Sequence, residues 1–399
     1  MDKRVFYTLN IAVFTSMLGM GIVLPFMPIY ARTLGATGIT IGIFFASFPL
    51  AQMVFMPLIS RLSDRHGRKM FMVLGLLGSS LLSLWYVYAP NMLYLTLGRF
   101  LQGAAVALTL PIATAYVGDI APPEKRGTLM GIFNLSMTSS IGLGPLVGGW
   151  LSDQYGMEFS FYWMCLLNAL ACGLVLVLLP SSHSTGKAAV RRASYRQLLA
   201  RPRVKGLALY RVVNTIQMGL WFSFLPLLGT EILNINHTMI GWALACYMLV
   251  SSLVQVPFGR MADRFSKRLL IITSGLIGSF VFSFMFFVWT FWHLLLIAAV
   301  TGAMGAMAMP ALNAMAAEEG QDGNMGAVMG MLNMAMSVGM MLGPVLGGLV
   351  LDVSGLRPLF IFGAVAGVLG TFGFARLTTA APLPAVPTPR LAEGPTQAR

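Results

Sequence analysis

The sequence predicts an all-α membrane protein in which twelve transmembrane helices form two pseudo-symmetric six-helix bundles. Of its 399 residues, 57% are hydrophobic and only 10% are charged, and the mean hydropathy is +0.78. Soluble domains are far more polar than this. Runs of about 20 predominantly apolar residues, the length that spans a bilayer, recur along the whole chain.

An internal repeat with an offset of 199 residues predicts the two bundles. The charged segment SRLSDRHGRK at residues 60–69 is echoed by GRMADRFSKR at residues 259–268. The same offset relates Gly42 to Gly241 and Asp153 to Asp352. A register that holds without a gap over most of each half indicates two copies of one unit.

The apolar runs give the expected boundaries of the helices. In the first half these are residues 6–31, 38–60, 69–89, 92–117, 126–151 and 158–180, and in the second half 206–231, 239–261, 268–289, 291–316, 325–350 and 356–377. We therefore expect bundles at residues 1–180 and 206–378. The segment 181–205 is expected to be a basic cytoplasmic linker with a short amphipathic helix near residues 195–199. The Pro-rich segment 379–399 is expected to be a disordered cytoplasmic tail.

The distribution of basic residues predicts the orientation. With both termini in the cytoplasm, Arg32 and Arg357 lie in external turns and Arg99 and Arg211 lie within helices, which leaves 22 of the 26 Lys and Arg residues on the cytoplasmic side. We therefore expect a multi-pass protein of the cell inner membrane. The net charge of +13 is interpreted as topology and contact with anionic lipids, and not as a nucleic-acid footprint.

Four segments resemble motifs of the major facilitator superfamily, and within it the twelve-helix drug:proton antiporter group. They are SRLSDRHGRK at residues 60–69, LTLGRFLQG at 95–103, GLGPLVGG at 142–149 and LGMGIVLPFMP at 18–28, and the resemblance extends over about residues 6–377. Ser60 and Ser266 stand where the first motif and its echo usually have glycine. The resemblance implies the fold of that superfamily, alternating access, and efflux of drugs in exchange for protons.

The charged segments predict a latch on the cytoplasmic side. A carboxylate at a helix end can accept backbone N–H bonds and meet a cation. We hypothesise that such contacts hold this side closed in one state and break in the other, the alternative being that the residues only anchor the helices. The candidates are Asp64, Arg65, Arg68, Asp119, Asp263, Arg264 and Glu318.

The Gly-Pro-Gly-Gly segments predict close helix packing at the seam between the bundles. Small residues let helix backbones approach, and proline removes a helical hydrogen bond and bends the helix. Such helices suit a seam at which two halves rock, although ordinary tight packing is the alternative. The hinge and packing candidates are Gly142, Gly144, Pro145, Gly148, Gly149, Gly343, Pro344, Gly347 and Gly348.

Charges inside the membrane give the candidates for substrate binding and coupling. All 13 acidic residues are assigned to helix ends or turns, so that proton coupling is supported only by the resemblance. Arg99 is expected about 12 Å deep, where a charge costs at least about 2.5–3.5 kcal/mol, which favours a functional role over a purely structural one. The candidates for coupling or substrate contact are Arg99, Gln102, Arg211, Gln52, Asn134, Asn214, Gln217 and Asn333.

The remaining residues exclude several classes of function. No Walker-type loop, nucleophile–base pair or metal-ligand spacing occurs, so we expect no enzyme, no catalytic residue, no metal and no cofactor. The 29 Met residues favour an adaptable apolar cavity. We therefore expect a monomer that carries small hydrophobic or amphipathic compounds, with protons and membrane lipids as partners. Two alternatives stay open: a lipid or lipophilic-anion transporter or flippase that does not couple through a mid-membrane carboxylate, and a transporter-like sensor.

Overall fold

The computed structural model describes residues 3–122, 125–180, 195–320 and 324–379, without the side chains of Arg61, Asp64, Arg65, Arg126, Tyr195 and Arg196. Within these residues, twelve helical spans are long and apolar enough to cross a membrane, which confirms the predicted fold class. The expected tail at 379–399 and most of the expected linker at 181–205 lie outside the described residues.

The first half contains six spans, two of which are interrupted. Pro25 and Pro28 accompany a 3₁₀ turn in the first span, and Pro111 follows a break in the fourth, because proline cannot supply a helical N–H. The elements are α1 (Lys3–Val23), η1 (Leu24–Phe26), α2 (Met27–Thr33), α3 (Gly38–His66), α4 (Arg68–Val87), α5 (Met92–Ala107), α6 (Leu110–Ile120), α7 (Arg126–Tyr155) and α8 (Met157–Leu178).

The second half repeats these spans with the predicted offset. Its elements are α9 (Tyr195–Ala200), α10 (Pro202–Leu227), η3 (Leu228–Ile232), α11 (His237–Arg264), α12 (Lys267–Ser283), η4 (Phe284–Phe287), α13 (Phe291–Glu319), α14 (Met325–Ser354) and α15 (Leu356–Thr379). The first residues of α10 to α15 lie 199 positions after those of α1, α3, α4, α5, α7 and α8, respectively. The repeat therefore extends to the boundaries of the helices.

The charged segment 60–66 is helical, although the expected helices 38–60 and 69–89 leave residues 61–68 between them as a charged turn. Helix α3 continues through it to His66 and ends at Gly67, whose φ of +93° favours glycine. A charged segment can continue a helix beyond the apolar run because its side chains reach the polar surface of the membrane. Only Gly67 therefore separates helix α3 from helix α4.

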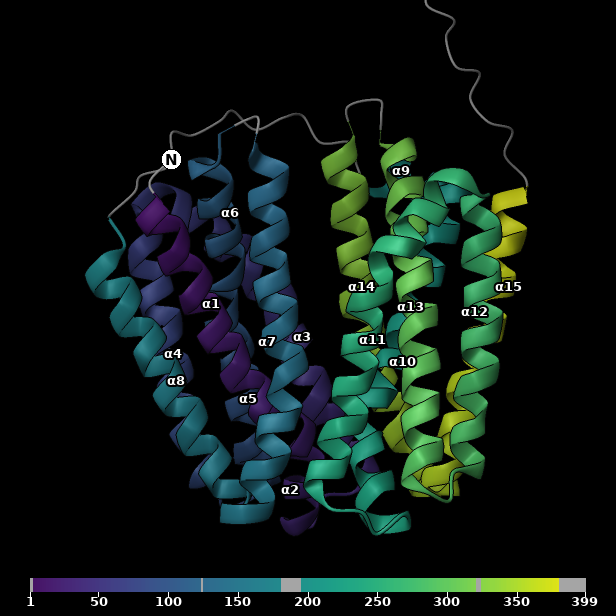
Figure 1. Cartoon of the computed structure of the whole chain (residues 1–399), viewed down its shortest axis with the longest axis horizontal. Helices are drawn as coiled ribbons and strands as arrows, with labels where there is room; N and C mark the ends of the chain where they lie inside the picture. The colour runs from purple at the N-terminus through teal and green to yellow at the C-terminus, as the bar shows by residue number, and fades with distance from the viewer. Residues whose placement is uncertain (1–2, 123–124, 181–194, 321–323, 380–399) are drawn as a thin grey trace, which may run out of the picture.

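Three apolar cores show how the bundles meet. One core draws on both halves and includes Phe26, Phe44, Trp221 and Phe360. The other two each lie in a single half, around Phe133 in the first and Leu312 in the second. Figure 1 shows the two bundles side by side, with the described ends of the chain at the same end of the molecule. The shared core lies at the opposite end, called here the closed end, and the end that carries the termini is called the terminal end.

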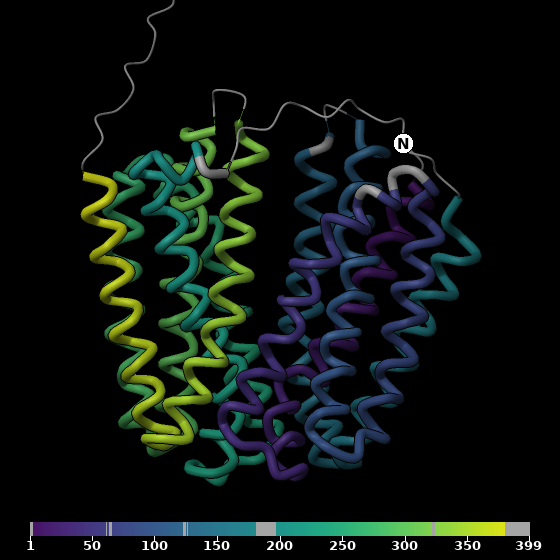
Figure 2. The backbone as a smooth tube through the Cα atoms, turned by 180° about the vertical axis from the view of Figure 1, so that it is seen from behind, coloured from purple at the N-terminus to yellow at the C-terminus, as the bar shows by residue number. Residues whose placement is uncertain are grey.

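Two pairs of helices from different halves pack against each other, α3 with α14 and α7 with α11. Seen from behind in Figure 2, α3 and α14 approach each other toward the closed end and diverge toward the terminal end. On the parts of these helices nearer the terminal end, large apolar side chains remain exposed, such as Leu58 at 60%, Leu135 at 61% and Leu253 at 76%. Across the described residues, the halves therefore share a core at the closed end and have separate cores toward the terminal end.

Candidate functional site

Two carboxylates join the halves at the closed end. Asp352, at the end of α14, accepts hydrogen bonds from the backbone N–H groups of Gly38 (2.5 Å) and Ile39 (2.9 Å) at the start of α3. Thr37 caps the next free N–H of the same helix with its own hydroxyl. An anion is stabilised there by unpaired N–H groups and by the positive end of the helix dipole. The start of α3 is thus capped partly by the other half of the protein.

The second carboxylate makes the equivalent contact in the other direction. Asp153, at the end of α7, accepts bonds from the backbone N–H groups of His237 (3.0 Å) and Thr238 (2.8 Å) at the start of α11, and from the Thr238 hydroxyl (2.6 Å). Asn236 caps the next N–H, as Thr37 does in α3. Because Asp153 and Asp352 are equivalent in the repeat, the two caps are related by the pseudo-symmetry of the molecule.

An ion pair lies between these caps. The Arg32 Nε atom is 3.0 Å from Glu231 Oε1, and the two residues are themselves 199 positions apart. A contact between equivalent residues lies close to the pseudo-two-fold axis. Both side chains are partly exposed, at 32% and 42%. Arg32, Asp153, Glu231 and Asp352 with their partners are called here the closed-end contacts.

Glycine permits the close approach of helices beneath these contacts. A Cβ atom on Gly42 would lie 2.8 Å from Val345 Cα and closer still to the carbonyl oxygen of Pro344. On the equivalent pair of helices, a Cβ atom on Gly241 would collide with the carbonyl oxygen of Pro145. Since backbone atoms cannot move aside easily, only glycine fits at these two positions.

The predicted hinge and packing residues fall into two groups. Gly149 and Gly348 contact the first residues of α11 and α3 across the seam, where the carbonyl groups of Pro145 and Pro344 also lie. Gly142 also faces the other half, in ordinary contact with Met248 of α11. The remaining glycines contact the first helix of their own half: Gly144 and Gly148 pack on α1, and Gly343 and Gly347 pack on α10. The motif thus packs helices both within and between the halves.

The predicted latch residues lie at the terminal end. The Arg68 Nη1 atom forms an ion pair with Asp119, and the equivalent Lys267 Nζ atom lies 2.6 Å from Glu318 Oε1. Each of these pairs lies within one half. Asp263 and Arg264 are exposed at the end of α11, while Asp64 and Arg65 lie on the last turn of α3 with side chains outside the described set. Sequence reasoning missed Lys267, although the repeat relates it to Arg68.

Arg99 lies in a buried polar cluster of the first half. Its Nη1 atom donates to Gln102 Oε1 at 2.6 Å, and the Tyr86 hydroxyl donates to the same oxygen at 2.8 Å. The guanidinium also lies over the Phe48 ring, 4.4 Å from its centroid, and only 3% of the residue is exposed. Neither the described hydrogen bonds nor the described ion pairs of Arg99 involve a carboxylate, and its Nε has no partner.

The other polar candidates lie apart from this cluster. The Nη2 atom of Arg211 is 3.0 Å from the sulfur of Met336 and its Nη1 atom contacts the sulfur of Met309, which keeps the guanidinium within the second bundle. Gln52 is half-buried on α3. The equivalent residues Asn134 and Asn333 are exposed on α7 and α14, nearer the terminal end. The structure therefore brings Arg99 together with Gln102 only.

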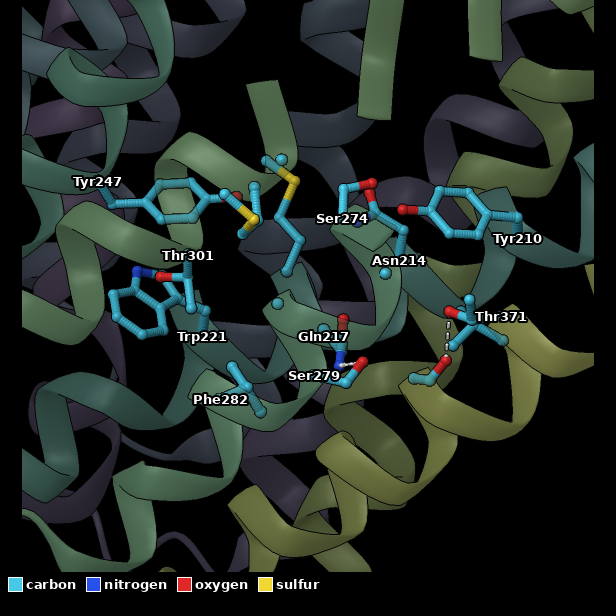
Figure 3. Close-up of a pocket in the computed structure, with 17 residues that line it drawn as sticks. Tyr210, Asn214, Gln217, Trp221, Tyr247, Ser274, Ser279, Phe282, Thr301 and Thr371 are labelled. Atoms are coloured by element: carbon cyan, nitrogen blue, oxygen red, sulfur yellow. Dashed lines mark hydrogen bonds between the residues drawn. The ribbon is translucent and has the colours of Figure 1, made fainter. Parts of the chain in front are cut away.

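A pocket in the second half brings together two further candidates, Asn214 and Gln217. It has a cavity volume of about 50 Å³ and is lined by residues of α10 to α13 and α15. The Gln217 side chain donates to the Ser279 hydroxyl and to the Gly363 carbonyl oxygen, both at 3.1 Å, as Figure 3 shows for Ser279. Trp221 and Tyr247 form the opposite wall, with ring centroids 5.4 Å apart.

Sequence reasoning missed the aromatic members of both clusters. Tyr86, Trp221 and Tyr247 lie in apolar runs where nothing in the pattern sets them apart from core residues. It also placed Asp153 and Asp352 only at external helix ends, although their equivalence in the repeat was visible.

Across the described ranges, no group of three or more His, Cys, Asp or Glu residues could hold a metal ion.

Comparison with known proteins agrees with this architecture. The family model described as Major Facilitator Superfamily matches residues 9–232 and 207–398. An uncharacterized MFS-type transporter of Methanocaldococcus jannaschii is 29% identical over 388 residues, covering 94% of this chain and 99% of that protein. Multidrug resistance protein 2 of Bacillus subtilis is 26% identical over 389 residues, covering 92% and 94%.

Among solved structures, the chain is similar to a bacterial homolog of the human lysosomal transporter Spinster, captured in an inward-facing and occupied conformation. The TM-score is 0.81 at 14% identity, and the alignment covers 94% of this chain and 96% of that one. This similarity concerns the fold, which agrees with the twelve spans and the repeat described above. The chain is a multi-pass membrane transporter that belongs to the Major Facilitator Superfamily.

Proposed function

We propose that this protein exports hydrophobic or amphipathic compounds across the cell inner membrane by alternating access, in exchange for protons. The observation that carries the proposal is the asymmetry between the two ends: the halves share one core and the closed-end contacts at one end, and have separate cores at the other. A transporter that rocks about a seam needs contacts of this kind, polar and reversible, at each end in turn.

The basic residues support cytoplasmic termini, and with this orientation the terminal end would face the cytoplasm and the conformation described here would be open toward it. Substrate would enter between the bundles from that side. Release of the closed-end contacts would open the external side, while the latch residues around Asp64 and Asp119 would hold the cytoplasmic side closed. The multidrug resistance protein among its relatives, at 26% identity, supports hydrophobic drugs as the class of substrate.

Proton exchange needs carboxylates that are exposed to each side in turn. The described structure offers such groups only toward the ends of the helices, among them Asp119 at the terminal end and Asp153, Glu231 and Asp352 at the closed end. We propose these residues, together with Asp64, as the sites at which protons act. Protonation would remove the negative charge that each cap or ion pair requires.

The buried Arg99 favours a second candidate, the transport of lipophilic anions or lipids. A guanidinium that is 3% exposed and donates to the neutral amide oxygen of Gln102 keeps its positive charge within the first bundle. A positive charge of this kind attracts an anionic substrate and disfavours a cationic one. The two candidates therefore differ in the charge of the substrate.

Transport by purified protein in proteoliposomes tests both candidates. Cationic, neutral and anionic amphiphiles are compared with and without a pH gradient, and protein-free liposomes and the Arg99→Met variant serve as controls. We expect movement of neutral and cationic amphiphiles that follows the gradient. If instead anions move independently of the pH gradient and this movement is lost in Arg99→Met, the first candidate is wrong and the second candidate takes its place.

A further inference from the structure

The pocket of the second half lies where the side chains of the two repeats differ in size. Thr301, Gly305, Gly275 and Gly367 line it, and the equivalent positions of the first half carry the larger Gln102, Val106, Leu76 and Asn168. In the first half, Gln102 accepts a hydrogen bond from the Tyr86 hydroxyl, and Asn168 accepts one from the Ser16 hydroxyl. At other lining positions the second half carries the larger side chain, as in Met218, Met304 and Phe282, where the first half has Gly19, Ala105 and Ser83. The cavity of about 50 Å³ therefore depends on where the small and large side chains lie around it.

The pocket has a mixed polar and apolar lining without charged groups. None of the described residues that line it is acidic or basic, and its hydrogen-bonding groups include Asn214, Gln217, Tyr247, Ser279 and Thr301. An ion would lose its hydration on entering and gain no counter-charge from the walls. The chemistry of the lining therefore selects an uncharged group.

One donor in the wall lacks an acceptor. The indole Nε1–H of Trp221 is buried and has no hydrogen-bond partner, although the residue is only 1% exposed. Buried donors are nearly always paired, because leaving one unpaired costs free energy. Figure 3 places this ring beside Thr301 and Tyr247, at the edge of the pocket. A ligand with a hydrogen-bond acceptor would satisfy the donor.

The other walls suit an aromatic group. The Trp221 ring lies 5.4 Å from that of Tyr247 and 6.3 Å from that of Phe282, and Met218 and Met304 add flexible thioethers. The volume is small, since one water molecule occupies about 30 Å³ of liquid and a drug-sized ligand needs a pocket of about 300–1,000 Å³. The pocket can therefore take only one end of such a molecule.

We propose that this pocket is a substrate subsite that receives the uncharged, hydrogen-bond-accepting end of an aromatic compound, such as an aryl ketone, with Trp221 Nε1–H as the donor. This inference rests on the proposed function, because a compound bound in the pocket is a substrate only if the protein transports it. It assigns recognition of uncharged groups to the second half of the protein, whereas the charged Arg99 belongs to the first.

Photolabelling with benzophenone tests the subsite directly. Benzophenone is an uncharged aryl ketone whose excited carbonyl takes a hydrogen atom from a nearby C–H group, after which the two carbon radicals combine into a bond. The full chain in lipid nanodiscs is irradiated with this probe, and labelled peptides are located by mass spectrometry. We expect label on Met218 or Met304, and we expect excess diphenylmethane, which lacks the carbonyl, to compete poorly.

Two variants sharpen the test, and the first has a matched control. Trp221→Phe keeps an aromatic ring but removes the donor, and it should reduce labelling of the pocket about 3- to 10-fold, the range for one neutral hydrogen bond. Trp292→Phe changes an exposed tryptophan and should leave labelling unchanged. Gly305→Ala should also reduce labelling, since its Cβ would lie 3.7 Å from the Tyr247 hydroxyl, a contact that the fold tolerates while the pocket narrows.

Labelling and transport are scored separately. Label confined to residues outside the pocket, or wild-type labelling in Trp221→Phe, overturns the subsite even if the protein transports the probe. Pocket labelling that needs Trp221 supports the subsite, and if proteoliposomes then show no transport, it is the proposed export that fails.

Discussion

Removal of the closed-end caps should open the external side of the protein. In Asp352→Ala, α3 loses the acceptor of two N–H groups, those of Gly38 and Ile39. Hydrogen bonds to a charged group contribute about 1.5–3 kcal/mol each, and a helix cap contributes about 0.5–2 kcal/mol. Because water can replace the carboxylate at this partly exposed position, we take about 2 kcal/mol as the loss to the closed state.

This loss corresponds to about a 30-fold shift in the ratio of open to closed molecules. The equivalent Asp153→Ala removes bonds to His237 and Thr238 and should have a similar effect. The two caps share no partner, so their effects should add, which gives about 4 kcal/mol or about a 10³-fold shift for the double variant. The single variants therefore shift the balance, and the double variant should be mostly open.

Electron-electron double resonance measures this balance. Spin labels at Tyr88 and Trp292 report on the separation of the halves, since these exposed positions follow α4 of the first half and begin α13 of the second near the closed end. The native cysteines Cys165, Cys172 and Cys246 are first replaced by alanine. Glu158→Ala, which removes an exposed carboxylate near the same end, is the control. An unchanged distance distribution in the double variant would refute the role assigned to the caps.

Three further changes test other parts of the reasoning. Gly42→Ala should open the closed end, because the added Cβ meets backbone atoms of Pro344 and Val345. The control Gly131→Ala should leave this end closed, because its Cβ meets nothing within 4 Å. The same spin labels measure both effects. Arg99→Met should keep its melting temperature, since an apolar residue of similar length can replace a buried cation without loss. If lipophilic anions are the substrate, its transport of anionic amphiphiles should fall at least about tenfold, and full transport of anions would make Arg99 structural. Lys267→Gln should cost at most about 1 kcal/mol in thermal unfolding, because both partners of its ion pair are partly exposed, and a larger loss would show that the pair is more than a surface contact.

The fold followed from the sequence because its signals are local or periodic. Apolar runs of spanning length fix the number of helices, since a backbone in lipid must satisfy its hydrogen bonds within each span. The 199-residue offset then fixes the two halves, and the helix boundaries obey it. The charged segment 60–66 was misjudged as a turn because charge marks the surface of the membrane, whereas the end of the helix depends on Gly67.

The candidate site was less predictable because its contacts join residues far apart in the sequence. The sequence by itself determined that Asp153 and Asp352 are equivalent, predicted that both lie at external helix ends or turns, and predicted that Arg99 carries a charge into the bilayer. Only the tertiary structure decided that each aspartate caps a helix of the opposite half, since a cap depends on which helix start lies opposite it. It alone also located the pocket of the second half, because a cavity depends on how side-chain volumes add up across five packed helices.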